Sequence, residues 1–200
     1  MILEKLNNSA KLLLNINDIA NILCVKRESA KVTAARYYKK SSLIRLKKDL
    51  YITKTKFDNL KEEQFFQIAN FLQTPSYISL TTALSYYNIT TQQQSNFIES
   101  IALKRTKNVS INNIEFTYTL IKKNIYQGFH LNNNFFIALP EKALADAIYL
   151  TSLVKYNCDF DAIDFNKINA NTVFDYLKNT NKKTILFWEK LCKTYKIWKN

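Results

Sequence analysis

Apolar residues near the start of the chain recur at helical spacing, in groups separated by short polar stretches. Residues 2–14 predict a packing helix or two short ones. Asn17 or Asp18 is expected to cap the next helix, because a short side-chain oxygen accepts hydrogen bonds from the free N–H groups at a helix start. That helix would bury the apolar residues between Ile19 and Leu23.

A second helical pattern is expected to begin near Arg27 or Glu28 and to run to Lys40. Its expected core-facing residues are Ala30, Ala34, Tyr37 and Tyr38. Strands are then expected at residues 43–47 and 50–53, on either side of Lys48-Asp49. Glycine is usual at such a tip, and Asp is among the few residues that tolerate a left-handed backbone. Two short helices followed by a charged hairpin predict a winged helix-turn-helix over residues 17–53.

The remainder of the chain mixes both periodicities. Residues 54–63 are typical of a linker, Phe65–Leu72 of a short amphipathic helix, and Pro75 breaks that helix before a new one begins at Ser79 or Thr81. Strands are expected at residues 97–103, 114–121 and 135–138. Pro140 should open a strong helix over residues 141–153. Further helices are expected at about residues 159–165, 170–178 and 183–197.

These patterns predict an α+β protein of two domains. A winged helix-turn-helix would occupy residues 1–56, a linker residues 57–63, and a mixed α/β domain with a small sheet and a helical C-terminus residues 64–200. The apolar fraction of 47% and the charged fraction of 22% are those of a globular protein. No apolar run reaches the ~18 residues that a membrane span needs. Three widely spaced cysteines and the lack of a secretion signal favour a cytoplasmic location.

The charge is unevenly distributed along the chain. Residues 1–56 hold 13 Lys and Arg against 4 Asp and Glu, a net of +9, whereas residues 57–200 hold 16 against 12, a net of +4. A basic module joined to a nearly neutral one indicates polyanion binding by the first and another task for the second. The alternative is a solvated surface in a generally basic protein.

The basic and small polar residues of the second helical pattern and of the hairpin are the candidate DNA contacts. In a helix-turn-helix the second helix lies in the major groove, and a wing reaches flanking phosphates or the minor groove. The candidates are Arg27, Ser29, Lys31, Thr33, Arg36, Lys39, Lys40, Arg45, Lys47 and Lys48. Which of them read bases is left open; an Arg, which can make two bonds to guanine, is favoured. A winged helix used for protein contacts is the alternative.

Catalytic signatures are weak. The one His, His130, is expected in an irregular segment beside Gly128, with no metal-ligand set around it. Ser76 and Ser79 have no nearby base in sequence, and a chain with a single Gly cannot form a Gly-rich phosphate loop. A helix start explains the Asp159, Asp161 and Asp164 cluster, and core packing explains most of the Tyr and Phe residues better than base stacking. We expect no catalytic residue, no cofactor and no metal.

Three stretches carry a resemblance to a known family. They are residues 18–51, Pro75–Tyr87 (PSYISLTTALSYY) and Phe136–Leu150 (FIALPEKALADAIYL). In order and spacing they resemble the AbiEi family, the antitoxins of abortive-infection type IV toxin–antitoxin pairs. The chain departs from the usual pattern at Asp49, where Gly is usual, at Tyr37-Tyr38 after Arg36, where an Arg-Leu pair is typical, and at Ser42, where Gly often precedes the wing strand.

The resemblance implies two activities. The N-terminal domain would bind inverted repeats in its own promoter as double-stranded DNA and repress transcription. The C-terminal domain would counteract a nucleotidyltransferase-like toxin, and direct contact with that toxin is not assumed. Either a monomer or a weak dimer that binds DNA cooperatively would fit a palindromic site. The rival hypotheses are a winged-helix regulator without a toxin, whose second domain senses a ligand or protein, and an enzyme acting on nucleic acid.

Overall fold

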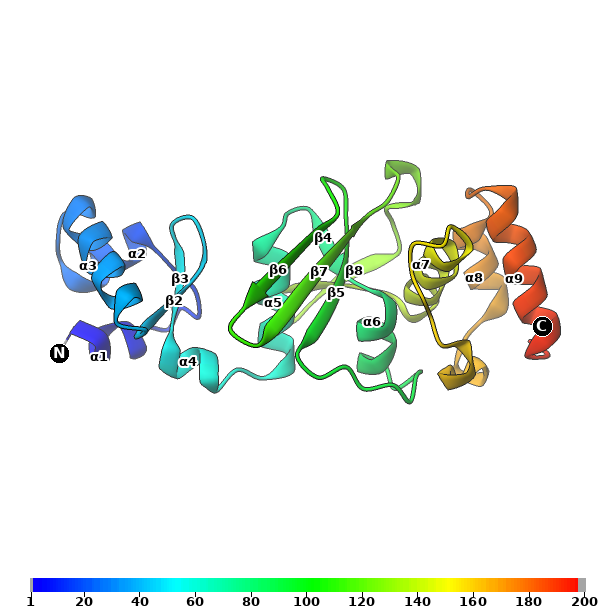
Figure 1. Cartoon of the computed structure of the whole chain (residues 1–200), viewed down its shortest axis with the longest axis horizontal. Coiled ribbons are helices and arrows are strands. Elements are labelled where there is room, and N and C mark those ends of the chain that lie inside the picture. The colour runs from blue at the N-terminus through cyan, green and yellow to red at the C-terminus, as the bar shows by residue number, and fades with distance from the viewer. Residues whose placement is uncertain (1, 198–200) are drawn as a thin grey trace. The chain divides into compact units, whose positions relative to one another are not determined.

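The computed structural model describes residues 2–197, which fall into two compact units divided between residues 64 and 65. Each unit is described by itself. The first contains helices α1 (Ile2–Asn7), α2 (Ile16–Leu23), α3 (Arg27–Lys39) and α4 (Lys54–Asp58), with strands β1 (Leu14–Asn15), β2 (Leu43–Lys47) and β3 (Leu50–Thr53). The strands form an antiparallel sheet in the order β1-β3-β2. Figure 1 shows α2 and α3 beside the β2–β3 hairpin.

The core of the first unit comes from all of its early elements. Leu6 of α1, Leu14 of β1, Ile19 of α2 and Leu43 of β2 are each 1% exposed or less, and they pack with Ala30 and Ala34 of α3. The helical spacing of Ala30 and Ala34 is what turns one face of α3 to this core. The expectation for these two residues is confirmed, and Tyr37 is partly buried against the same cluster.

The structure corrects several local expectations in this unit. Residues 2–14 hold one helix and the start of a strand, because Leu14 pairs with Tyr51 in the sheet. Tyr38 does not face the core and is 50% exposed. Asn15, rather than Asn17 or Asp18, caps α2: its Oδ1 accepts from the Asp18 N–H at 2.9 Å, while the Asp18 carboxylate accepts from the Asn15 N–H at 2.9 Å. The reciprocal pair satisfies two of the free donors at the helix start.

The β2–β3 hairpin follows the sequence expectation closely. Both strands have the expected bounds, and Ile44 pairs with Ile52 in the sheet. Asp49 at the turn has a φ of 57°, in the left-handed region that Asp tolerates. Residues 57–63, expected as a linker, hold the end of α4 and the first residues of α5 (Glu62–Leu72), so that only residues 59–61 lie between helices.

The second unit is built around a six-stranded sheet. Its strands are β4 (Ser76–Ile78), β5 (Phe97–Ala102), β6 (Lys107–Ile111), β7 (Ile114–Leu120), β8 (Phe129–Asn132) and β9 (Phe135–Ala138), in the order β6-β7-β5-β4-β9-β8. The β5–β7 and β4–β9 pairs are parallel and the other pairs antiparallel. With its helices, this mixed sheet gives the α+β fold that we expected. The strands expected at β5, β7 and β9 are confirmed, whereas β4, β6 and β8 were missed.

The helices of the second unit complete its core. They are α5, whose residues from Phe65 on belong here, α6 (Leu80–Tyr86), α7 (Pro140–Ser152), α8 (Ala170–Leu177) and α9 (Lys182–Thr194). Ser79 is the N-cap of α6 and Pro140 opens α7, as expected. Helix α7 is buried on nearly all sides, and α7, α8 and α9 pack against one another (Figure 1). The helix expected at residues 159–165 is instead two short 3-10 turns, Phe160–Ala162 and Phe165–Lys167.

Candidate nucleic-acid interface

Helix α3 presents a solvent-facing surface opposite its Ala30–Ala34 face. Ser29, Arg36, Lys39 and Lys40 are exposed, and Lys31 and Thr33 are half-buried at its margins. Val32 lies on this surface and is 70% exposed. Because the Val32 side chain contributes little to the core of its own unit, it is free to contact a molecule that binds at this surface.

Two of the candidate cations are already paired within the unit. The Arg27 Nε donates to Asn17 Oδ1 at 3.1 Å, and its Nη2 lies 4.0 Å from Asp49 Oδ2 at the hairpin turn. Lys31 Nζ lies 3.0 Å from the Glu28 carboxylate. The Arg27–Asp49 contact places the tip of the hairpin beside the start of α3, which brings the helix and the hairpin into one surface.

Five other exposed cations of this surface have no carboxylate partner among the described residues. Within residues 2–197, no carboxylate lies within ion-pair distance of Arg36, Lys39, Lys40, Arg45 or Lys48. The Arg36 guanidinium carbon lies 5.4 Å from the centroid of the Tyr37 ring, and Lys47 is also exposed on β2. Unpaired cations on α3 and on the hairpin give this surface a positive potential, which suits it to a polyanion.

The sequence identified these cations but gave no sign of the two contacts that hold Arg27. Asp49 was considered only as a turn residue, whereas it also faces Arg27. Asn17 was considered as a helix cap, whereas its side chain accepts from Arg27. Both contacts join residues that are far apart in sequence, and neither leaves a periodic signal that could have been read from the chain.

The two later family-like stretches meet in a buried polar network. The Asp146 carboxylate, 1% exposed, accepts from Tyr77 Oη at 2.9 Å, Ser79 Oγ at 2.8 Å and Lys142 Nζ at 2.6 Å. Lys142 Nζ also donates to the Ile125 carbonyl at 2.8 Å. Tyr77 and Ser79 belong to the Pro75–Tyr87 stretch, and Lys142 and Asp146 to the Phe136–Leu150 stretch. The network therefore fixes β4 and α6 against α7. This structural role explains the four residues without assigning them a catalytic one.

A second buried carboxylate lies near the start of α6. Glu99 of β5 is 3% exposed and accepts from the Thr82 backbone N–H at 3.3 Å and from Tyr156 Oη at 3.1 Å. Burial raises the pKa of Glu99, and the hydrogen bonds only partly oppose that effect. Near it lies the buried thiol of Cys158, whose pKa is raised to about 12 by burial and secondarily by the charge on Glu99.

The other residues weighed as catalytic or metal-binding candidates either cap turns or lie apart from one another. His130 lies on β8, not in an irregular segment, and is exposed. Asp159 and Asp164 cap the two 3-10 turns, as the helix-start interpretation expected. Residues 2–197 contain no group of three or more His, Cys, Asp or Glu side chains placed to hold a metal ion. None of the helices described is both long enough and apolar enough to span a bilayer.

Comparison with solved structures shows a similarity at the level of the fold. The chain is similar to the crystal structure of RV2827C protein from Mycobacterium tuberculosis, with a TM-score of 0.63 and 9% sequence identity. The similarity covers 96% of this chain and 75% of that chain. No protein-family model matches the chain, and no curated protein matches it. At this level of identity, the similarity establishes a shared fold and nothing further.

Proposed function

We propose that the chain is an antitoxin and transcriptional autorepressor. In this proposal the first unit is a winged helix-turn-helix that binds inverted repeats in its own promoter. The second unit counteracts a nucleotidyltransferase-like toxin. The observation that carries the DNA half is the set of exposed, unpaired cations on α3 and the hairpin, joined into one surface by Arg27 and Asp49.

The mechanism at DNA is charge neutralisation combined with insertion of α3 into the major groove. Arg36 is our candidate for base reading, because it is exposed, has no carboxylate partner among the described residues and lies on the outward face of α3. The five unpaired cations and Lys47 would supply about six phosphate contacts. Affinity should then fall by ~10³ between about 50 and about 200 mM salt, through release of counterions.

Binding to DNA from upstream of the gene tests this half. The full-length protein and a labelled upstream fragment are titrated over a salt series, with a scrambled fragment as competitor. Arg36→Ala should weaken binding to the upstream fragment by ~1–3 kcal/mol and reduce the preference over the scrambled one. Arg105→Ala removes one exposed positive charge from the second unit and is the matched control. Equal affinity of Arg36→Ala and the parent would contradict the base-reading assignment.

The antitoxin half rests on the resemblance of the Pro75–Tyr87 and Phe136–Leu150 stretches to the AbiEi family. Residues of both stretches bond to the Asp146 carboxylate. This contact supports the proposal, because it gives the two stretches a common role in the fold of the second unit. A full-length Arg36→Ala, Lys39→Ala, Lys48→Ala protein should lose repression and still protect cells that express the neighbouring toxin gene. Loss of protection in this variant, at unchanged protein level, would show that the two tasks are not divided between the units.

A regulator without a toxin partner is the second candidate. A cavity of about 290 Å³ in the second unit favours it, because a sensing domain needs a place for its ligand. Inspection of the neighbouring genes separates the two proposals. A reading frame with a nucleotidyltransferase-like Gly-Ser motif and paired aspartates supports the antitoxin, and its absence supports the regulator.

A further inference from the structure

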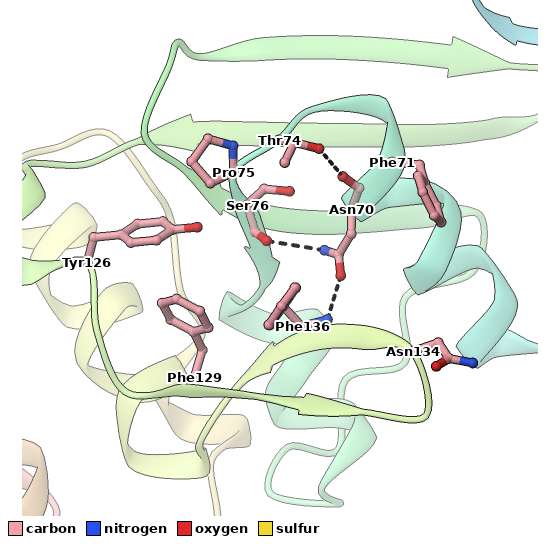
Figure 2. A pocket seen from close by; sticks show the side chains of 9 residues that line it. All are labelled: Asn70, Phe71, Thr74, Pro75, Ser76, Tyr126, Phe129, Asn134 and Phe136. Atoms are coloured by element: carbon pink, nitrogen blue, oxygen red, sulfur yellow. Dashed lines mark hydrogen bonds between the residues drawn. The ribbon is translucent and has the colours of Figure 1, made fainter. Parts of the chain in front are cut away.

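The second unit contains an aromatic-lined cavity of about 290 Å³. It lies among the end of α5, the start of β4 and the β8–β9 hairpin, as Figure 2 shows. The lining residues are Asn70, Phe71, Thr74, Pro75, Ser76, Tyr126, Phe129, Asn134 and Phe136. None of the nine carries a charge. Its volume is close to the lower end of the range for small-molecule sites, roughly 300–1,000 Å³.

The cavity opens where two strands of the sheet separate. Strands β4 and β9 are joined in parallel register at Ile78 and Ile137. Just before that pair, the side-chain amide of Asn70 lies between them: it accepts from the Phe136 N–H at 2.5 Å and is 3.5 Å from the Ser76 carbonyl, to which it donates (Figure 2). Because Asn70 bonds to both strands, they part without leaving these backbone groups unsatisfied. The opening is thus a stable part of the fold.

Aromatic rings that brace one another form one wall. The Phe129 ring lies 5.0 Å from the Tyr126 ring and 5.9 Å from the Phe136 ring, both edge to face. Phe129 is also stacked on buried Tyr77 at 4.5 Å. At the mouth, Phe71 and Phe136 remain 51% and 42% exposed. Fixed rings with exposed apolar area at the mouth offer a preformed surface for a flat apolar ligand.

One polar group of the lining lacks a partner. The Tyr126 hydroxyl is buried and makes no hydrogen bond to any group of the described residues. Burial, and secondarily the charge on Asp146, raises the pKa of Tyr126 to about 12, so the hydroxyl stays neutral and able to donate. A buried hydroxyl that donates to nothing costs free energy. A bound molecule whose acceptor atom lay within hydrogen-bond distance of Tyr126 Oη would remove that cost.

We propose that this cavity binds a small, uncharged aromatic molecule that carries one hydrogen-bond acceptor beside its ring. The uncharged lining disfavours an ion, because an ion would lose its hydration shell there and find no opposite charge in exchange. The volume limits the ligand to a compact ring system, and the rings of Tyr126, Phe129 and Phe136 favour a planar one. The Tyr126 hydroxyl supplies the polar contact that fixes its orientation.

Two probes of similar shape test the proposal on the full-length protein. Acetophenone and ethylbenzene differ in the carbonyl oxygen that would accept from Tyr126. Each is titrated into ¹⁵N-labelled protein and followed by two-dimensional NMR. Both should shift the amide signals of the cavity lining. Tyr126→Phe should weaken acetophenone binding by about 2- to 10-fold, as expected for one hydrogen bond, and leave ethylbenzene binding unchanged.

Two further variants locate the site. Phe136→Ser removes a half-exposed ring of the wall and should weaken both probes, whereas Leu186→Ser changes an exposed apolar residue of α9 and should affect neither. Absence of cavity shifts with both probes at millimolar concentration would overturn the proposal, as would equal binding to the Phe136→Ser protein. Equal weakening of both probes by Tyr126→Phe would overturn the assigned ligand class. No DNA is used, so these outcomes are independent of the proposed repressor activity.

Discussion

The buried ion pair of α7 predicts a particular pattern of unfolding free energies in a double-mutant cycle. Lys142 and Asp146 are 2% and 1% exposed, and their charged atoms lie 2.6 Å apart. Removing one partner of a buried pair leaves the other charge uncompensated and costs about 3–5 kcal/mol. Asp146→Asn keeps an acceptor for the Tyr77 and Ser79 hydroxyls but turns an amide toward the ammonium. Lys142→Met leaves a buried carboxylate with only those two hydroxyls.

Removing both charges together should be far less harmful than the two single changes suggest. The double variant has an apolar side chain at position 142 and a neutral amide at 146, so that no buried charge remains unpaired. We expect each single variant to lose ~3–5 kcal/mol and the double variant to lose no more than the worse single. Losses of this size are a large share of a typical stability of ~5–15 kcal/mol.

Urea unfolding followed by tryptophan fluorescence measures this cycle. Trp188 is buried in the second unit, so its signal reports on the unit that contains the pair, and Trp198 lies outside the described residues. The exposed pair Asp175–Lys178, whose side chains are 64% and 54% exposed, is the control, and its cycle should show a coupling within ~1 kcal/mol. Single variants that lose under about 1 kcal/mol, or a double variant whose loss equals the sum of the singles, would refute the reasoning.

Two further predictions follow from single side chains. Because burial raises the pKa of Glu99 above its ordinary value of 4.5, the stability that protonated Glu99 contributes is present at acid pH and lost as pH rises through the raised value. Glu99→Gln should therefore become more stable relative to the parent as pH rises toward neutrality, measured by urea midpoints; parallel pH profiles would contradict this. Val32, exposed on the outward face of α3, should contact thymine methyl groups in bound DNA. Replacing thymine by uracil in the DNA fragment should therefore weaken DNA binding by the parent by ~1 kcal/mol and should not weaken DNA binding by Val32→Ala further. An equal loss for both proteins would remove Val32 from the interface.

The first unit followed from the sequence because local signals determine it. The spacing of Ala30 and Ala34 defined the buried face of α3, and the tolerance of Asp49 for a left-handed backbone allowed the hairpin turn. The cap at Asn15 was misjudged because Asn15, Asn17 and Asp18 are all short polar residues near the start of α2. Asn15 begins the helix because it still lies in β1, where it pairs with Leu50 of β3. The candidate cations could be identified by residue type, while the partners of Arg27, which are Asn17 and Asp49, depended on tertiary structure.

The second unit was harder to predict because its defining contacts are distant in sequence. Strand β4 has three residues and lies between a helix and a helix start, and its strand character comes from neighbours β5 and β9. Strand β8, with exposed His130, gives only a weak alternating pattern at the sheet edge. Lys142 and Asp146 are both internal, because α7 is buried on nearly all sides, and no local pattern in the sequence shows that burial.

The separations within the Asp146 network bear on the order in which the chain folds. Its bonds to Tyr77 and Ser79 close loops of 69 and 67 residues, and the parallel pair β4–β9 likewise joins distant segments, at Ile78 and Ile137. Such closures slow folding, because chain entropy is lost before the contacts form. The first unit needs only residues up to 64, whereas the core of the second unit cannot close until α7 has been synthesised. On the ribosome, the basic surface is therefore complete while the second unit still lacks its central helix.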